Sequence, residues 1–184
     1  MKFITPMAAA LACAVATSCF ASSANAAQAT FYQLPPNAYP HDVAPAADGT
    51  VWYSGQRGGF LGHFDPKTGK NEEIPLGPGA APHGVIVGPD GAPCITEGGQ
   101  NAIARVDPVT LEVKLFPLPK EFGYANLNTA AFDKKGILWF TGQSGVHGRV
   151  DPATGKVDAW RSPRGSGSYG ITATPGGYLK CVKD

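Results

Sequence analysis

Four polar side chains recur along the chain at intervals of about 42 residues, and their types suit proton transfer, polar recognition or metal binding. They are His41, His83, Asn128 and Tyr169. A neutral imidazole near pH 7 can act as a general base or as a metal ligand. A carboxylate, Glu97, follows His83 in the same stretch of sequence. If the fold brings these groups to one face, they predict a site for a polar ligand or a divalent metal ion.

The segments around these residues repeat, which indicates how they are positioned. The segments 41–53, 83–95 and 128–140 align with one another, and each has a glycine in its central turn. A fourth copy of this pattern follows later in the chain. These glycines are Gly49, Gly91, Gly136 and Gly177, which lie 42, 45 and 41 residues apart. A second motif, Asp-Pro at 65–66, 107–108 and 151–152, predicts a further tight turn in each unit. Each unit therefore has the pattern of four short antiparallel strands. This number of strands in a repeat of about 42 residues is typical of a β-propeller blade. A β-sandwich is the structural alternative, but it gives no reason for a fixed period.

The predicted fold class is all-β, a propeller of four-stranded antiparallel blades with about three complete blades and a partial fourth. The blade units are expected at about 41–82, 83–127, 128–168 and 169–184. Residues 30–36 resemble an outer strand and are expected to be an orphan strand that closes the partial blade. The 184 residues, less a leader of 26, hold under four periods. The expectation is thus a propeller truncated relative to a six- or seven-bladed ring, with four-bladed closure as the alternative and with open strand edges that favour self-association.

Equivalent positions of successive blades lie on an arc around the channel of a propeller, so the four recurring residues should meet at one channel mouth. A hairpin centred near Asp90 would place Glu97 opposite His83 at that rim. The loops carrying Gln100 and Asn101 should open on the same side. We therefore predict that His41, Asn128, Tyr169, Gln100 and Asn101 contact a ligand. The alternative interpretation is that these side chains only hydrate the channel mouth and bind backbone groups.

Other candidate residues are interpreted as structural. His63 and His147 lie within third strands, where a lone histidine is usually a satisfied structural residue. Trp52 and Trp139 share one position in their units and are expected to be core wedges between blades. Cys94 takes that position in the second unit and is expected to be a small buried hydrophobic residue rather than a nucleophile.

Residues 1–26 have the pattern of a secretory signal peptide, with Lys2, an apolar run over 7–15 and a small-residue cleavage site at 24–26. This pattern predicts a periplasmic or secreted protein, with a permanent anchor or a lipoprotein at Cys19 as the alternatives. The charged side chains comprise 15 basic and 14 acidic residues. This balance leaves no excess of positive charge that would attract nucleic acid or an anionic membrane. Neither is therefore expected as a partner beyond the export step.

The repeat motifs resemble those of the virginiamycin B lyase, or streptogramin lyase, family. The resemblance lies in Pro-His-Gly-Val-x-Val-Gly-Pro-Asp-Gly over 82–91, Ile-Thr-Glu over 95–97, the segment 101–108 and Leu-Trp-Phe-Thr over 138–141. It covers essentially the whole chain after the leader. It implies a propeller whose active site lies at the channel mouth, uses Mg²⁺ and opens the ester bond of a cyclic depsipeptide by elimination.

Carried over residue by residue, the resemblance makes His83 the catalytic base and Glu97 a metal ligand. Ala81 stands where the family motif has its first glutamate, so one of the two expected metal carboxylates is replaced. The expected partner is a small cyclic peptide or another polar small molecule. The alternative is a noncatalytic propeller that binds a ligand or protein, or an inactive truncated fragment. A lactone hydrolase of related fold would need a cluster of acidic and asparagine metal ligands, which the sequence lacks.

Overall fold

The computed structural model describes residues 28–165, 167, 169–174, 176 and 179–182. Its strands form three four-stranded antiparallel sheets, in which neighbouring strands are consecutive in sequence, and one two-stranded sheet. The first sheet is β1 (Pro40–Pro45), β2 (Val51–Gly55), β3 (Phe60–Phe64) and β4 (Asn71–Pro75). The second is β5 (Pro82–Val87), β6 (Pro93–Glu97), β7 (Ala102–Val106) and β8 (Val113–Pro117). The third is β9 (Leu127–Phe132), β10 (Leu138–Gly142), β11 (Val146–Val150) and β12 (Val157–Arg161). The last is β13 (Gly170–Ala173) with β14 (Leu179–Val182).

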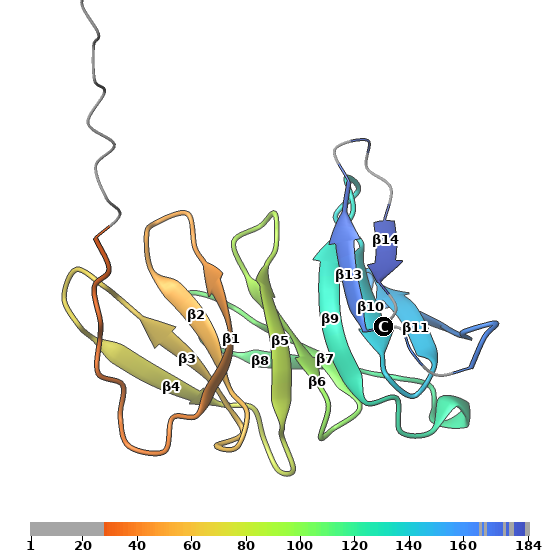
Figure 1. Ribbon diagram of the computed structural model, residues 1–184, viewed down its shortest axis with the longest axis horizontal. Coiled ribbons are helices and arrows are strands. Elements are labelled where there is room, and N and C mark those ends of the chain that lie inside the picture. The colour runs from red at the N-terminus through yellow and green to blue at the C-terminus, as the bar shows by residue number, and fades with distance from the viewer. Residues whose placement is uncertain (1–27, 166, 168, 175, 177–178, 183–184) are drawn as a thin grey trace, which may run out of the picture. The chain divides into compact units, whose positions relative to one another are not determined.

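The first strands of successive sheets, β1, β5, β9 and β13, pack against one another in chain order (Figure 1). This arrangement places one strand of every sheet at a common centre and the later strands outside it, as in the blades of a propeller. The predicted fold class, three complete blades and a partial fourth, is confirmed. A short 3₁₀ turn, η1 (Lys120–Phe122), precedes the third blade. Within the described residues, no helix has the length and apolar character needed to cross a bilayer.

The Asp-Pro motifs close the outer hairpins as predicted. Asp65 Oδ1 accepts a hydrogen bond from the backbone amide of Lys67 (2.8 Å), and its carbonyl accepts one from Gly69, whose φ is 75°. Only glycine adopts this left-handed conformation without steric cost. Leu111 takes the same position in the second blade at φ 60°, so the turn geometry survives there at some expense in strain.

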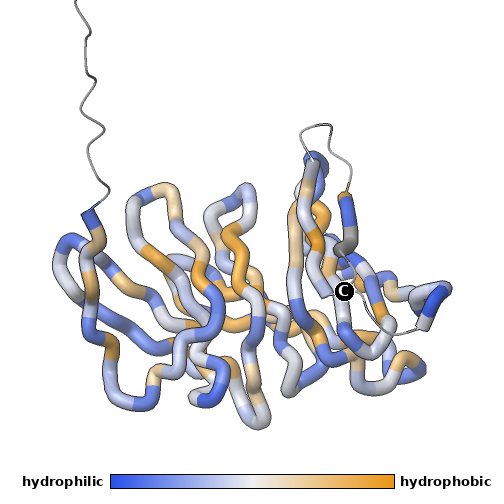
Figure 2. Tube along the Cα trace, viewed as in Figure 1, coloured by the Kyte–Doolittle hydropathy of each residue, from blue (hydrophilic) through white to orange (hydrophobic). Residues whose placement is uncertain are grey.

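The apolar core lies between blades, where the faces of neighbouring sheets meet. Apolar residues are concentrated in strands such as β5, while most connecting loops are hydrophilic (Figure 2). Between the first two blades, Trp52 and Leu61 pack with Ile95 and Val106. Between the second and third, Cys94 joins a larger cluster that includes Phe140. Stability therefore depends on each blade having a neighbour.

The prediction for Cys94 agrees with the structure, since its thiol is free and buried, and burial raises its pKa to about 12. Trp52 is a core wedge, 2% exposed, and stacks on His63 with ring centroids 3.9 Å apart. Trp139 departs from the prediction: it is only partly buried and stacks instead on Trp160. The physical reason is its neighbour, because the face of β10 looks toward a sheet of two described strands rather than four.

The orphan strand expected over 30–36 does not form. A strand needs a partner edge for its backbone groups, and the sheet of β13 and β14 contains no strand from this region. Instead, Tyr32 packs edge-on against Phe64 with ring centroids 5.0 Å apart, and Leu34 covers the outer face of the first blade. The predicted signal peptide lies outside the described residues.

Candidate functional site

A β-bulge interrupts the first strand of every complete blade close to the predicted channel mouth. In the second blade Pro82 pairs with Glu97 and Val85 pairs with Ile95, so two residues of β5 lie opposite one of β6. The same irregularity separates Pro40 from Val43 in β1, and β9 has its counterpart. The predicted pairing of His83 with Glu97 is therefore wrong by one residue. Bulges re-aim side chains and commonly occur next to functional sites.

A buried hydroxyl fills each bulge and links it to the next blade. The hydroxyls belong to Ser54, Thr96 and Thr141, all fully buried. Each accepts from a backbone amide of its own first strand, at Asp42, Gly84 and Thr129. Each also donates to the carbonyl of the recurring residue in the following blade, at His83, Asn128 and Tyr169. Sequence reasoning missed these residues, although a hydroxyl at the same place in all three repeats was a readable signal.

The bulges and hydroxyls bring His41, Asp42, His83 and Asn128 together. The imidazole rings of His41 and His83 have centroids 4.1 Å apart, and His41 Nδ1 lies 3.1 Å from Asp42 Oδ1. Asn128 Nδ2 lies 3.2 Å from His83 Nε2 on the other side. Asp42 was not predicted, because its position holds Gly84 and Thr129 in the other repeats. Tyr169 continues the series through its carbonyl, and its side chain is about half exposed, at 46%.

The environment of His83 favours the neutral imidazole. Burial lowers its pKa below the ordinary 6.5, and the neighbouring His41 lowers it further, against a smaller opposing effect of Asp42. Thr129 Oγ1 donates to Asn128 Oδ1 (2.7 Å), so the Asn128 amide nitrogen donates to His83 Nε2. The neutral ring then carries its proton on Nδ1, which is buried and has no hydrogen-bond partner among the described residues. His83 is thus an oriented imidazole ready to accept a proton.

Glu97 does not join this cluster. Its side chain is fully buried, and Oε1 accepts hydrogen bonds from the backbone amides of Ala81 and Gly99. Oε2 is buried without a hydrogen-bond partner among the described residues. Burial raises the pKa of Glu97, although the backbone hydrogen bonds partly oppose the shift. The carboxylate predicted as a metal ligand therefore holds together the loop before β5 and the loop after β6.

We expect Glu97→Gln to become relatively more stable than the wild type as pH rises. Since the folded pKa of Glu97 is raised, folding favours its protonated form, and the wild type loses stability as pH rises from the unfolded pKa of 4.5 through the folded one. Glutamine keeps the acceptor for both amides and does not ionise. Urea unfolding at pH 4 and pH 7 measures the difference. An unchanged gap between the two proteins across this range would contradict the assignment.

Gln100 and Asn101, predicted to contact a ligand, have their amides bound to backbone groups. Gln100 Nε2 donates to the carbonyls of Leu76 and Pro78. Asn101, at φ 53°, donates to Gly123 and accepts from the amide of Ala125. Both side chains therefore brace the loops that connect neighbouring blades, and their contact with a ligand stays a prediction.

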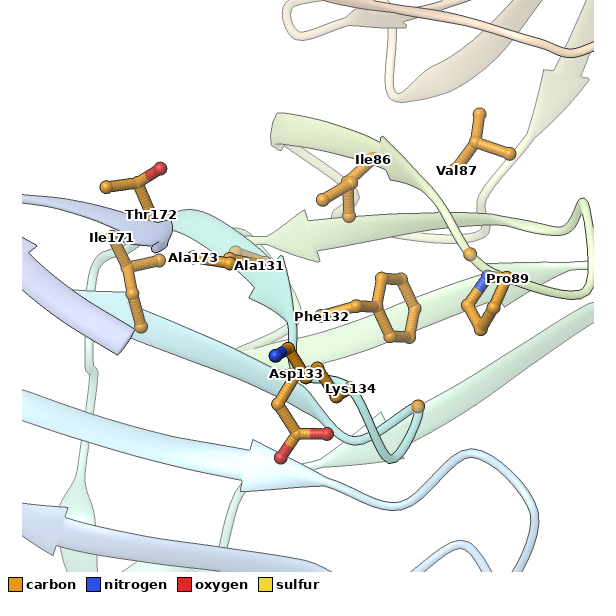
Figure 3. A pocket seen from close by; sticks show the side chains of 13 residues that line it. Ile86, Val87, Pro89, Ala131, Phe132, Asp133, Lys134, Ile171, Thr172 and Ala173 are labelled. Atoms are coloured by element: carbon orange, nitrogen blue, oxygen red, sulfur yellow. The ribbon is translucent and has the colours of Figure 1, made fainter. Parts of the chain in front are cut away.

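A cavity of about 610 Å³ lies at the opposite ends of the central strands (Figure 3). Its lining includes Ile86 of β5, Phe132 of β9 and Ile171 of β13, and none of the recurring polar residues. The carboxylate of Asp133 beside it is held by backbone amides and by Trp139 Nε1. The cavity walls are mostly apolar, and Lys134 and Thr172, the other polar residues of the lining, are exposed, so the histidine cluster is the better candidate site.

The described residues do not fit Mg²⁺. Magnesium binds through oxygen ligands in octahedral geometry, usually with carboxylates. One expected carboxylate is replaced by Ala81, and Oε1 of the other, Glu97, is engaged by two backbone amides. The histidine cluster offers a single carboxylate, Asp42, beside two imidazoles. The predicted magnesium site is not formed by these side chains.

Fold and site together define a blade-repeat β-propeller with a polar, histidine-bearing channel mouth. The chain belongs to the virginiamycin B lyase family, whose model matches residues 9–183. No curated protein gives a significant match to the sequence.

Solved structures agree with this assignment. The selenomethionine-substituted virginiamycin B lyase from Staphylococcus aureus matches with a TM-score of 0.73 and 24% identity over 83% of this chain and 52% of its own. A catalytically inactive histidine-to-alanine variant of that enzyme with quinupristin matches with a TM-score of 0.75 and 24% identity, over the same shares. The chain thus spans about half the length of these structures. The extracellular domain of a putative one-component system from B. thetaiotaomicron shares the fold, with a TM-score of 0.64, 18% identity, and coverage of 83% of this chain and 20% of that one.

Proposed function

We propose that the protein is an exported lyase of the virginiamycin B type, which opens the ester of a cyclic depsipeptide by elimination. The observation that supports this is the half-buried His83, kept neutral by its surroundings and oriented by Asn128. A general base must be unprotonated and held within reach of the proton it removes. His83 meets both requirements.

In this mechanism the base nitrogen is Nε2, because Nδ1 is buried and carries the proton. The substrate displaces the Asn128 amide from Nε2, and its acidic C–H bond breaks with transfer of the proton to His83. A carbon–carbon double bond forms as the ester C–O bond breaks, and the carboxylate leaves. His41, whose ring is tilted against that of His83, is 38% exposed and lies where a substrate could contact it.

The test is turnover of quinupristin by the purified chain, followed by mass spectrometry. We expect His83→Ala to lower kcat/KM by about 10²–10⁴-fold, the usual contribution of a general base. The acid limb of the wild-type pH profile should fall below pH 6.5, since the pKa of His83 is lowered. His147→Gln, altered on β11 away from the cluster, is the control. Undiminished turnover by His83→Ala, or no turnover by the wild type, would contradict the proposal.

A noncatalytic binding propeller is the second candidate, favoured by the removal of Glu97 from the cluster and by Ala81 in place of a glutamate. Calorimetry separates the two functions: quinupristin would bind to the wild-type chain without product appearing.

Export is part of the proposal. It is supported by the leader pattern of residues 1–26 and by the extracellular domains among the structural neighbours. Fractionation of cells expressing the full chain, with detection in periplasm or medium, tests it. Self-association through open strand edges stays a prediction, measured by light scattering of the purified chain.

A further inference from the structure

The histidine cluster has the geometry of a metal site formed between two blades. One ligand atom each from His41, Asp42 and His83 lie within 4.8 Å of one another. Among the described residues, this is the single group of three histidine, cysteine or acidic side chains that does so. His41 and Asp42 come from the bulge of β1, and His83 comes from the bulge of β5. The side chains of His41 and Asp42 are 38% and 42% exposed, so an ion can reach them from solvent.

The donor types select the class of ion. Two imidazoles with one carboxylate are a ligand set of Zn²⁺ and related divalent transition metals, and three protein ligands leave a position open for water. Mg²⁺ is disfavoured because two of the three donors are nitrogens. The two rings have centroids 4.1 Å apart, so a nitrogen of each lies close enough to bind the same ion.

The backbone that carries the ligands is already fixed. Ser54 Oγ accepts from the amide of Asp42 (3.0 Å) and donates to the carbonyl of His83 (2.6 Å), so one buried hydroxyl joins both ligand-bearing strands. Gly84 lets the strands approach, because a Cβ at this position would lie 2.6 Å from the carbonyl oxygen of Asn128 and 3.5 Å from Asp42 Oδ2. Binding therefore requires movement of side chains only.

Asn128 can support His83 as a ligand. His83 Nδ1 has no described hydrogen-bond partner, so it becomes available to a metal ion once the ring proton has moved to Nε2. The ring proton then sits on Nε2, and Asn128 turns its amide so that Oδ1 accepts it. Thr129 Oγ1, 2.7 Å from that amide, is a hydroxyl and can accept where it now donates. A partner on the second ring nitrogen is what ligating histidines generally have.

We propose that His41, Asp42 and His83 form a binding site for a divalent transition-metal ion of the zinc class. This inference does not rest on the lyase activity. The two are linked through His83, because a metal-bound imidazole cannot remove a proton. Zinc bound at this site would therefore inhibit elimination.

The experiment is calorimetric titration of ZnSO₄ into the tag-free full chain, without substrate, alongside an identical titration with MgCl₂. We expect one Zn²⁺ per chain and no binding of Mg²⁺ at the same concentrations. Asp42→Asn and His41→Ala should each weaken Zn²⁺ binding at least tenfold. His147→Gln, which removes an imidazole of the third blade, should bind as the wild type does.

Visible absorption of the Co²⁺-loaded chain provides a second readout, because the intensity of its bands reports ligand geometry and should fall in Asp42→Asn. Circular dichroism verifies the fold of each variant, and the isosteric Asp42→Asn keeps the test valid if His41→Ala fails to fold. Absence of Zn²⁺ binding to the wild type, or equal binding by Asp42→Asn and the wild type, overturns the proposal. A failed quinupristin assay would leave it standing, since no substrate is used here.

Discussion

Replacing Trp52 by alanine is expected to lower the free energy of unfolding by about 3–5 kcal/mol, as for other large aromatic residues removed from a core. The ring is 2% exposed, stacks on His63 and fills the interface between the first two blades. Its removal leaves a cavity that the surrounding strands can only partly close. Urea unfolding followed by circular dichroism measures the loss, and the slope of the transition checks that cooperativity is retained.

Trp139→Ala is the matched comparison, because Trp139 has the same place in the repeat but is only partly buried. We expect a loss of about 1–2 kcal/mol, since part of this ring already contacts water and no closed cavity results. Equal losses in the two variants would contradict the conclusion that blades are stabilised by their neighbours.

Thr96→Val is expected to lower the free energy of unfolding by about 2–4 kcal/mol, because two buried backbone groups lose their partner at once. The Thr96 hydroxyl accepts from the amide of Gly84 and donates to the carbonyl of Asn128, so it joins the second and third blades. Valine has nearly the same shape, which separates the hydrogen bonds from packing. Chemical unfolding at pH 7 gives the value.

Thr172→Val is the control, since this exposed residue of β13 undergoes the same change of side chain. It should alter stability by less than about 0.5 kcal/mol. If Thr96→Val behaved the same way, the hydroxyl would not be a link between blades.

The fold could be predicted from the repeat because glycine and Asp-Pro mark the turns of each blade, and short apolar runs mark its strands. The arc of His41, His83 and Asn128 also followed from the period alone. The bulge could not be predicted in this way, since counting residues back from the hairpin assumes uninterrupted pairing. That single inserted residue moved Glu97 away from His83.

The remaining differences come from competition for hydrogen bonds, which residue types do not reveal. Glu97, Gln100 and Asn101 have the right chemistry for ligand binding, but Glu97 Oε1, Gln100 Nε2 and Asn101 Oδ1 are bound to nearby backbone groups. Asp42 entered the site although its position in the other repeats is occupied by Gly84 and Thr129. A residue that breaks the repeat at the channel mouth was therefore more informative than one that continued it.

The hydroxyl groups that join neighbouring blades bind backbone carbonyls at the channel mouth. The side chains of the residues that carry these carbonyls take no part in the link and can therefore vary. Ser54, Thr96 and Thr141 hold the carbonyls of His83, Asn128 and Tyr169, three residues with unrelated side chains. An imidazole, an amide and a phenol thus occupy the same structural position with the same hydroxyl support. The mouth of such a propeller can change its ligand by substitution at these positions while its architecture stays fixed, which makes it a natural starting point for engineering new specificity.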